Sequence, residues 1–419
     1  MNCEILSVGT ELLLGSTVNT DAADLSVMLA EMGVNVYWHS VVGDNPVRLR
    51  EAVNIARGRA DLIVTTGGLG PTCDDLTKNV LAEAFGLSME YHPEEEAYIR
   101  ARLAANGRPF TENNLQQVWL PAGSDVLHND WGTAPGCAFE AGGVTVVMLP
   151  GPPRECDSLF RHVARPWLAA RAADGGAIVS RNLRIFGLGE SDVEDRLRAR
   201  MLAMRNPTLA PYAKEAEVIL RVTAKAASAA EAAALCEPEV ERLRQELGSY
   251  VYGVDEPSLE TLCLRLLTER GMTFAAAESC TGGLLSKRLT DVPGASAAFL
   301  GGGVTYTEAV KERLALVPAE TIERFGVVSR EVALAMARGI RENLSADFGA
   351  GITGLAGPDG DGMHPVGTIF IALAGPDGEF CRRMNGGVGR TRNRLMAANH
   401  ALDMLRRYLT GLPVVEEEI

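Results

Sequence analysis

The chain has 419 residues, 47% of them hydrophobic, and a formal net charge of −14. This length allows two to four domains with substantial cores. So acidic a chain repels the nucleic-acid backbone unless it carries a strong local basic patch. Arg181, Arg184 and the arginines of residues 196–205 are instead interleaved with acidic residues. We therefore expect no direct nucleic-acid partner.

The cysteines and the apolar runs bear on the cellular compartment. Eight cysteines are scattered without a Cys-x-x-Cys pair, which favours free thiols in a reducing compartment over zinc or thioredoxin-like sites. The N-terminus leads directly into a strand pattern without a basic segment, and no apolar stretch has the length of a membrane span. These features predict a cytoplasmic protein without a membrane partner.

Residues 1–170 alternate strand and helix patterns. Helical patterns cover Ala22–Met32 and Pro46–Arg57. The strand patterns are Glu4–Val8, Val34–Val42, Asp61–Thr66 and Gly143–Leu149. Such alternation, with glycines at strand ends, predicts a doubly wound α/β domain with a parallel sheet, whose ligands bind beyond the carboxyl ends of the strands.

Residues 171–253 are predicted to form a small α+β domain. Strand patterns at Leu183–Phe186 and Val218–Ala224 accompany an alanine-rich helix, Ala229–Leu247. We expect Pro238 to interrupt this helix. The segment has no catalytic cluster, which favours a role as a spacer or interface.

Residues 254–412 are predicted to form a second α/β domain, which ends with a helix at Thr391–Leu409. Small-residue or glycine loops follow its apolar runs, among them Gly301–Gly303. Several strand ends are therefore expected to converge on one site. Residues 413–419 contain Glu416–Glu418 and are expected to form a solvated acidic tail.

A short polar loop, AESCTGG at residues 277–283, follows an apolar strand and precedes a helical pattern. Ser279 in this loop lies close to unpaired backbone N–H groups and the positive end of a helix dipole. Such a position suits a phosphate cradle, or a nucleophile with an oxyanion hole made by N–H groups near Cys280, Gly282 and Gly283. A plain helix N-cap is the structural alternative.

A serine nucleophile needs a base, and this domain offers few. Its only histidines are His364, in a polar loop, and His400, inside the final helix. A lysine can serve when burial lowers its pKa, and Lys311, five residues after Tyr306, is the leading candidate. Cys280 is a rival nucleophile, because thiolates form more readily than alkoxides.

The motifs of this domain carry a family resemblance. AESCTGG, PGAS, GGGVTYTEAVK, TGLAGPDG, PVGT and GGVGR resemble the C-terminal domain of the CinA family, which also occurs alone as nicotinamide mononucleotide (NMN) deamidase. The resemblance implies that Ser279 is the catalytic serine and Lys311 its partner, without a cofactor. Four further residues are implied to shape the site and hold the mononucleotide: Tyr306, Ser296, Thr353 and Arg390. Arg390 also follows a glycine-rich loop at a helix start, a place that suits phosphate.

The chain departs from the family at two places. Family members more often have Ser-Asn-Glu-Ala-Lys after the tyrosine, whereas this chain has TEAVK at residues 307–311. The spacing to the lysine is kept, but Glu308 adds an acid that is expected to raise the lysine pKa. The family's Pro-Gly-Ser-Ser becomes PGAS at residues 293–296, which keeps the second serine. Both changes bear on rate and substrate preference more than on reaction type.

The loop GGLGPTCDD, residues 67–75, follows a buried strand in the first domain. Gly67, Gly68 and Gly70 allow a phosphate to approach the backbone, and the adjacent Asp74 and Asp75 can share a divalent cation with it. Acids in a first helical turn are also common without any ligand, because they interact favourably with the helix dipole.

The first domain also carries a family resemblance. GTELLLG, NTDA, GGLGPTCDD, GTAPG and LPGPPRE resemble the N-terminal domain of CinA proteins, which is similar to molybdopterin-binding proteins of the MoaB/MogA type. This resemblance implies hydrolysis of ADP-ribose with a divalent metal (Mg, Mn or Co), and adds Glu11 to Asp74 and Asp75 as metal candidates. Lys78 is a candidate for neutralising a phosphate. Asn19 and Arg154 are candidates for other ligand contacts. A domain that only binds a nucleotide or pterin is the alternative.

The resemblance extends over nearly the whole chain. It implies a bifunctional enzyme of pyridine-nucleotide salvage, which deamidates NMN and hydrolyses ADP-ribose. The middle segment resembles the family's KH-like unit, but it has no GxxG with basic neighbours to support RNA binding. The family's name, competence/damage-inducible, leaves open an accessory protein in DNA uptake or damage response. A homodimer is expected from the large apolar helices.

Overall fold

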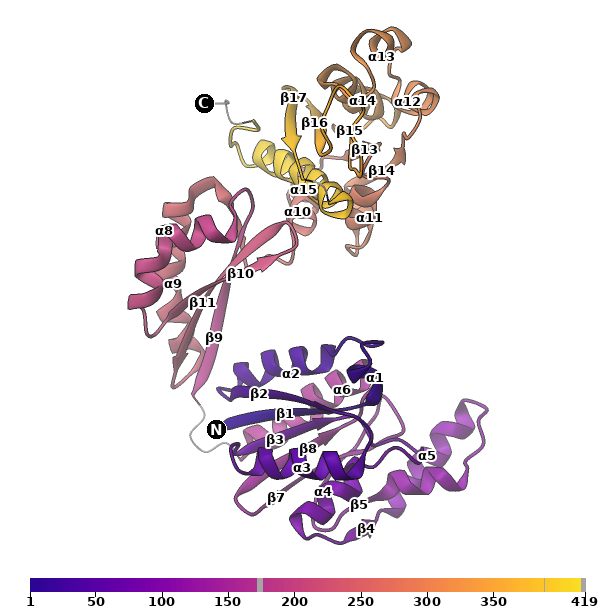
Figure 1. Ribbon diagram of the computed structural model, residues 1–419, viewed down its shortest axis with the longest axis vertical. Helices are drawn as coiled ribbons and strands as arrows, with labels where there is room; N and C mark the ends of the chain where they lie inside the picture. The colour runs from indigo at the N-terminus through magenta and orange to yellow at the C-terminus, as the bar shows by residue number, and fades with distance from the viewer. Residues whose placement is uncertain (172–175, 388, 416–419) are drawn as a thin grey trace. The chain divides into compact units, whose positions relative to one another are not determined.

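The structure, a computed structural model, describes residues 1–171, 176–387 and 389–415 (Figure 1). It divides into two compact units. The first holds Ala224–Ala234 and the described residues from Met1 to Val179, and the second holds Ser180–Thr223 and the described residues from Leu235 onward. The predicted acidic stretch Glu416–Glu418 lies outside the described residues.

The main sheet of the first unit has the strand order β2-β1-β3-β8-β7-β6. The strands are β1 (Asn2–Val8), β2 (Asn35–Val42), β3 (Leu62–Thr66), β6 (Asp125–Leu127), β7 (Gly136–Ala141) and β8 (Val144–Leu149), and β4 (Met89–Tyr91) pairs separately with β5 (Trp119–Pro121). β2, β1, β3 and β8 run parallel, which confirms the predicted sheet, whereas β7 and β6 are antiparallel strands that the sequence did not predict.

Helices cover both faces of this sheet (Figure 1), because successive strand residues point to opposite sides. Ile5 and Val64 pack with α2 and α6 in one buried cluster, and Leu6 and Ile63 pack with α3 and α4 in another. The helices are α1 (Thr10–Leu13), α2 (Thr20–Glu31), α3 (Pro46–Arg57), α4 (Thr77–Phe85), α5 (Pro93–Ala105), α6 (Pro153–Leu159) and α7 (Arg165–Ala169), with a 3₁₀ helix, η1, at Glu112–Val118 and a π-helical turn at Phe160–Ala164.

The middle segment forms a sheet with the order β10-β11-β9-β12. Its strands are β9 (Ala177–Ile185), β10 (Thr208–Lys214), β11 (Glu217–Ala226) and β12 (Val251–Val254), with helices α8 (Glu190–Ala203) and α9 (Ala229–Leu247) and a 3₁₀ turn at Gly248–Tyr250. β10 was not predicted, because most of its side chains are exposed and give no apolar alternation.

The expected interruption of α9 at Pro238 is wrong. The helix continues through the proline, although a proline inside a helix costs roughly 3 kcal/mol. Cys236 and Val240, on either side of it, are buried, as are Ala232 and Leu243. Burial of this apolar stripe stabilises the helix by more than the proline costs.

The sheet of the C-terminal segment has the order β14-β13-β15-β16-β17. Its strands are β13 (Phe274–Glu278), β14 (Phe299–Val304), β15 (Phe348–Gly354), β16 (Thr368–Gly375) and β17 (Gly378–Asn385), of which β14, β13 and β15 are parallel and the other pairings antiparallel. The run Gly301–Gly303 lies inside β14 rather than in a loop. A Cβ atom on Gly302 would lie 2.3 Å from the Ala276 carbonyl oxygen, so close pairing with β13 explains a glycine there.

Helices again cover both faces of the sheet (Figure 1). They are α10 (Leu259–Arg270), α11 (Leu284–Thr290), α12 (Glu308–Ala315), α13 (Ala319–Phe325), α14 (Arg330–Asn343) and α15 (Arg390–Leu409), with a 3₁₀ turn at Ala295–Ala297. α14 lies very close to β15, since Cβ atoms on Gly349 and Gly351 would lie 2.1 Å and 2.2 Å from backbone carbonyl oxygens of the helix. No helix of the described residues is long and apolar enough to cross a membrane.

A buried ion cluster holds α15 in place. The Asp403 carboxylate accepts hydrogen bonds from Arg382 on β17 and from Arg406 and Arg407 on α15 itself. Asp403, Arg406 and Arg407 are each less than 5% exposed. A charge removed from such a cluster leaves its partners buried without compensation, which is far more costly than loss of an exposed pair.

We predict that Asp403→Asn lowers the free energy of unfolding by about 3 kcal/mol, because asparagine keeps the shape and removes the charge. The four tryptophans, at positions 38, 119, 131 and 167, all lie in the first unit. Denaturant unfolding should therefore shift when followed by far-ultraviolet circular dichroism and remain unchanged when followed by tryptophan fluorescence. Asp291→Asn, which breaks the exposed pair with Lys287, is the matched control and should cost less than about 0.5 kcal/mol. Equal losses in the two variants would contradict the prediction.

Candidate functional site

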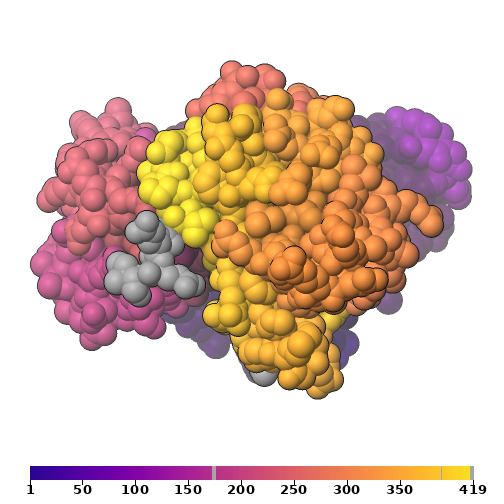
Figure 2. All heavy atoms as spheres, turned by 90° about the horizontal axis from the view of Figure 1, so that it is seen from above, coloured from indigo at the N-terminus to yellow at the C-terminus, as the bar shows by residue number. Residues whose placement is uncertain are grey.

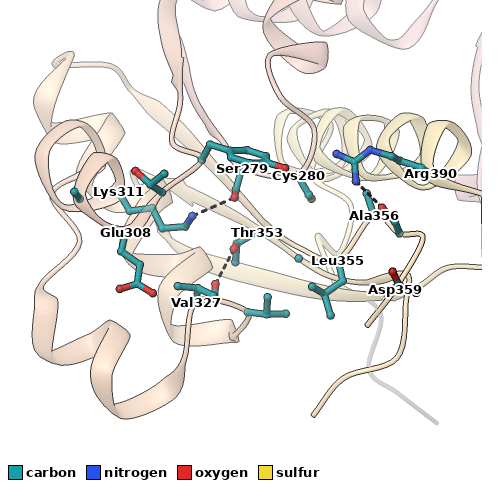
Figure 3. A pocket seen from close by; sticks show the side chains of 16 residues that line it. Ser279, Cys280, Glu308, Lys311, Val327, Thr353, Leu355, Ala356, Asp359 and Arg390 are labelled. Carbon is teal, nitrogen blue, oxygen red and sulfur yellow. Dashed lines mark hydrogen bonds between the residues drawn. The ribbon is translucent and has the colours of Figure 1, made fainter. Parts of the chain in front are cut away.

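Ser279 and Lys311 meet in the C-terminal domain (Figure 3). Ser279 directly follows the last residue of β13, and Lys311 lies in the first turns of α12. The Lys311 Nζ atom lies 3.1 Å from Ser279 Oγ and 2.8 Å from the carbonyl oxygen of Thr305. The two side chains lie 32 positions apart in sequence, and the parallel pairing of β13 with β14 brings them together.

Burial determines the protonation of this lysine. Lys311 is 2% exposed and Ser279 is 8% exposed. Loss of water lowers the pKa of the Lys311 amine, and the Cys280 thiol and the Glu308 carboxylate oppose that shift. The expected effect of Glu308 on the lysine is thus present, but desolvation is the larger influence. An amine with a lowered pKa can accept the proton of an adjacent hydroxyl near neutral pH.

Both residues line a cavity of about 600 Å³ at the carboxyl ends of the parallel strands β14, β13 and β15. Of the residues predicted for this site, Ser279, Lys311, Tyr306, Thr353 and Arg390 line the cavity. Figure 3 shows Lys311 and Arg390 on opposite sides of Ser279.

Two predicted residues of the cavity are fixed by backbone contacts. Thr353 is buried, and its hydroxyl donates to the Val327 carbonyl over 2.7 Å. Arg390 begins α15, and its Nη1 donates to the Gly357 carbonyl over 2.6 Å, which leaves the rest of the guanidinium for an anion. Tyr306 is 61% exposed, so its ring lies on the rim.

The other predicted residues lie outside the cavity lining. Ser296 is exposed in the 3₁₀ turn before β14. Gly282 and Gly283 form the turn between Ser279 and α11, both with positive φ angles, 59° and 88°. The sequence analysis predicted these two glycines as part of a loop whose backbone N–H groups hold an oxyanion.

The loop does offer such donors. Within the described residues, the N–H groups of Cys280, Thr281 and Gly283 have no hydrogen-bond partner, whereas the Ser279 N–H donates to the Ile352 carbonyl. The first turn of α11 is already capped, because the buried Glu278 carboxylate accepts from the N–H groups of Leu285 and Ser286. Stabilisation of an oxyanion would therefore come from the loop rather than from the helix terminus.

The structure disfavours the rival catalytic groups, by position for the histidines and by protonation for Cys280. His364 bonds to Asp361, and His400 lies on α15; neither lines the cavity. Cys280 does line it, but burial raises the pKa of its thiol to about 12, so that it stays protonated. Asp359, which the sequence analysis missed, also lines the cavity. Asp359 belongs to the quoted motif TGLAGPDG, and this position could have identified it as a site residue.

A second cavity, of about 500 Å³, lies in the first unit at the carboxyl ends of the parallel strands β1, β2, β3 and β8. Among the predicted residues, Glu11, Asp74, Asp75 and the three glycines of the loop after β3 line it. Gly67 has a φ of 91°, and a Cβ atom there would lie 2.2 Å from the Val8 carbonyl oxygen. Only glycine permits this close turn.

The charged side chains that line this cavity are all acidic. Its lining, within the described residues, contains five carboxylates and neither lysine nor arginine: the acids are Glu11, Asp44, Asp74, Asp75 and Glu155. Asp44 and Glu155 were not predicted. Asp44 follows β2 as the glycine loop follows β3, and Glu155 is the last residue of the quoted motif LPGPPRE, so both signals were present.

The other residues predicted for the site of the first domain do not line this cavity. Lys78 is 3% exposed, and its ammonium donates to the carbonyl oxygens of Gln116 and Gln117, so the prediction that it neutralises a phosphate is not supported by its position. Asn19 caps α2 and bonds to Ser7. Arg154 is exposed and outside the cavity lining.

The donor set of the acidic cavity fits a hard divalent cation in part. Carboxylate oxygens are the preferred ligands of such ions, and Mg²⁺ is often held by one or two carboxylates together with water and substrate phosphates. Asp74 and Asp75 suit this mode, and both are held by Thr72. The described residues contain no group of three or more His, Cys, Asp or Glu side chains arranged to hold a metal alone.

The fold and these cavities define a multidomain α/β protein, with an acidic cavity in its first domain, a small α+β middle domain and a separate domain carrying a serine–lysine pair. Family models match in the same order: a probable molybdopterin binding domain at residues 4–170, the damage-inducible protein CinA KH domain at 180–253 and the CinA C-terminal domain at 256–409. The chain belongs to the CinA family.

Similar proteins cover the chain along its length. A CinA-like protein of Dictyoglomus turgidum is 44% identical over 98% of this chain and 100% of its own, and a putative competence-damage inducible protein of Lysinibacillus sphaericus is 42% identical over 98% of both. A solved structure of CinA from Thermoplasma acidophilum is 33% identical, covers 39% of this chain and 96% of its own, and has a TM-score of 0.37.

Proposed function

We propose that the C-terminal domain hydrolyses the carboxamide of NMN to give nicotinate mononucleotide and ammonia. The observation that carries the proposal is the 3.1 Å separation of Lys311 Nζ and Ser279 Oγ, buried in a cavity that also contains Arg390. The resemblance of the surrounding motifs to NMN deamidases supplies the substrate class.

The geometry supports a two-step acyl transfer. The neutral Lys311 amine accepts the hydroxyl proton as Ser279 Oγ attacks the carboxamide carbon, and the resulting ammonium donates that proton to the departing ammonia. The N–H groups of Cys280 and Thr281 hold the oxyanion. Water, deprotonated by the same amine, then cleaves the ester and releases the acid, while Arg390 binds the phosphate at the opposite side of the cavity.

For the first domain we propose hydrolysis of the pyrophosphate of ADP-ribose. The support is the acidic lining described above, because a pyrophosphate enters a cavity with five carboxylates and no cationic side chain only together with a metal ion. Asp74 and Asp75 would hold this ion, with Glu11 beside them, and the bound ion would supply charge neutralisation. The glycine loop would cradle the phosphates with its backbone.

We predict that Ser279→Ala lowers ammonia release from NMN by at least about 10³-fold, because loss of a catalytic nucleophile is rarely compensated. Lys311→Met, which keeps the volume of the buried chain, should have a similar effect. Cys280→Ala is the matched control in the neighbouring position and should retain most of the activity. A coupled ammonia assay checks all three, and an inactive Cys280→Ala beside an active Ser279→Ala would falsify the assignment.

We predict that activity rises with pH as Lys311 loses its proton, and that Glu308→Gln moves this rise to lower pH. The Glu308 carboxylate raises the pKa of Lys311, so its removal lowers that pKa further. The measurement is the pH dependence of kcat/KM. Glu312→Gln, one position beyond the lysine on α12, is the control and should leave the profile unchanged; identical profiles for both variants and wild type would contradict the role of Glu308.

We predict that the full-length protein releases AMP from ADP-ribose only when Mg²⁺, Mn²⁺ or Co²⁺ is present. Asp75→Asn should lower this rate by at least about tenfold through loss of an ion-holding oxygen, without changing ammonia release from NMN. Lys78→Met should leave the metal concentration required for half the maximal rate unchanged, since its ammonium faces η1. Absence of AMP with all three metals would contradict hydrolysis and favour the alternative of a domain that only binds a nucleotide or pterin.

A further inference from the structure

A separate cavity of the second unit has a strongly basic lining. It encloses about 570 Å³ beside β17, α15 and the residues that follow β9. Its charged lining residues, among those the structure describes, are Arg330, Arg382, Arg383, Arg407 and Asp403. In a chain with a net charge of −14, this is a local reversal of sign. Such a hollow attracts anions.

The buried part of this lining is fixed in place. Arg382 Nη1 lies 3.1 Å from Asp403 Oδ2 and 2.9 Å from His400 Nδ1. The same carboxylate also serves Arg406 and Arg407 on α15. One carboxylate is thus shared among three guanidinium groups. Arg382 Nη2 also donates to the Val414 carbonyl over 3.0 Å, so this arrangement fixes the orientation of the guanidinium groups.

His400 adds a neutral surface to the cavity. Its ring packs edge-on against Phe186, with centroids 5.1 Å apart. Burial and the neighbouring Arg382 lower the pKa of His400 to about 4, although Asp403 opposes the shift. The positive charge of the cavity therefore comes from arginines alone and persists across the neutral pH range.

Two exposed arginines complete the lining. Arg330 is the first residue of α14, and Arg383 lies on β17, with its guanidinium 5.9 Å from the Phe370 ring. Neither forms an ion pair with a described residue, although Glu331 follows Arg330 in sequence. Figure 2 shows the last described residues, yellow, beside the orange residues that precede them in sequence. The exposed Arg330 and Arg383 and the partly buried Arg382 can donate hydrogen bonds to the oxygens of a phosphate.

We propose that this cavity is a second anion site, which binds a phosphate-bearing small molecule through Arg330, Arg382 and Arg383. The site is independent of the Ser279 cavity, because the two linings share no residue among those described. Its ligand contacts the first residue of α14, which packs on β15, and β17, which Arg382 joins to Asp403 on α15.

The test is isothermal titration of the full-length protein with inorganic phosphate and, separately, AMP. Ionic strength is held constant and EDTA is present, so that the acidic cavity of the first unit has no metal. The background variant is Arg390→Ala, which removes the phosphate contact proposed in the Ser279 cavity. We expect binding in this background and at least a tenfold loss of affinity when Arg330→Ala and Arg383→Ala are added. Both positions are exposed, so the fold should survive, which circular dichroism checks.

Arg48→Ala, at an exposed arginine of the first unit, is the charge-matched control and should not change the affinity. Tighter binding of AMP than of phosphate would identify a nucleotide as the ligand, and equal binding would identify the phosphate group alone. The proposal is overturned if the Arg390→Ala background binds neither probe at about 10 mM, where even a weak site with a millimolar Kd is filled. It is also overturned if the added variants bind as well as the background. None of these results depends on ammonia release, so the proposed NMN activity stands or falls separately.

Discussion

The proposed chemistry of the C-terminal domain depends on the removal of one amine from water. A lysine in solution is protonated near neutral pH and cannot act as a base. Here the amine of Lys311 is enclosed with the Thr305 carbonyl and the Ser279 hydroxyl, and desolvation favours its neutral form. The strand β13, the loop after it and the start of α12 all serve this enclosure. No histidine among the described residues lines the cavity.

The two proposed sites share one architectural rule and differ in charge. Both lie at the carboxyl ends of parallel strands, where the loops that connect strands to helices converge. The C-terminal cavity provides its own cation, Arg390, whereas the cavity of the first unit is lined by carboxylates. A phosphate-bearing substrate therefore finds protein charges in one cavity and needs a soluble cation in the other.

Sequence patterns predicted the parallel strands of the first sheet, because alternating strands and helices leave a strong apolar signal. They did not predict β10, which is largely exposed, or the passage of α9 through Pro238, which depends on tertiary burial. For the sites, motif positions identified Ser279 and Lys311, which the fold brings together. The position of Lys78 does not support its predicted role, because sequence does not show whether an ammonium faces a cavity or the carbonyl groups of η1. Asp44 follows the end of β2, and Glu155 lies at the start of α6 in the quoted motif LPGPPRE, so both positions carried a signal.

The close approach of α14 to β15 affects how this domain can evolve. At Gly349 and Gly351 even one added methyl group would collide with the helix backbone, and at Gly339 with the carbonyl of Ala315. Enlarging a side chain there would displace the scaffold before it altered any substrate contact. Changes of substrate range are therefore expected at the rim, at positions such as Tyr306 and Glu308, rather than at these three glycines.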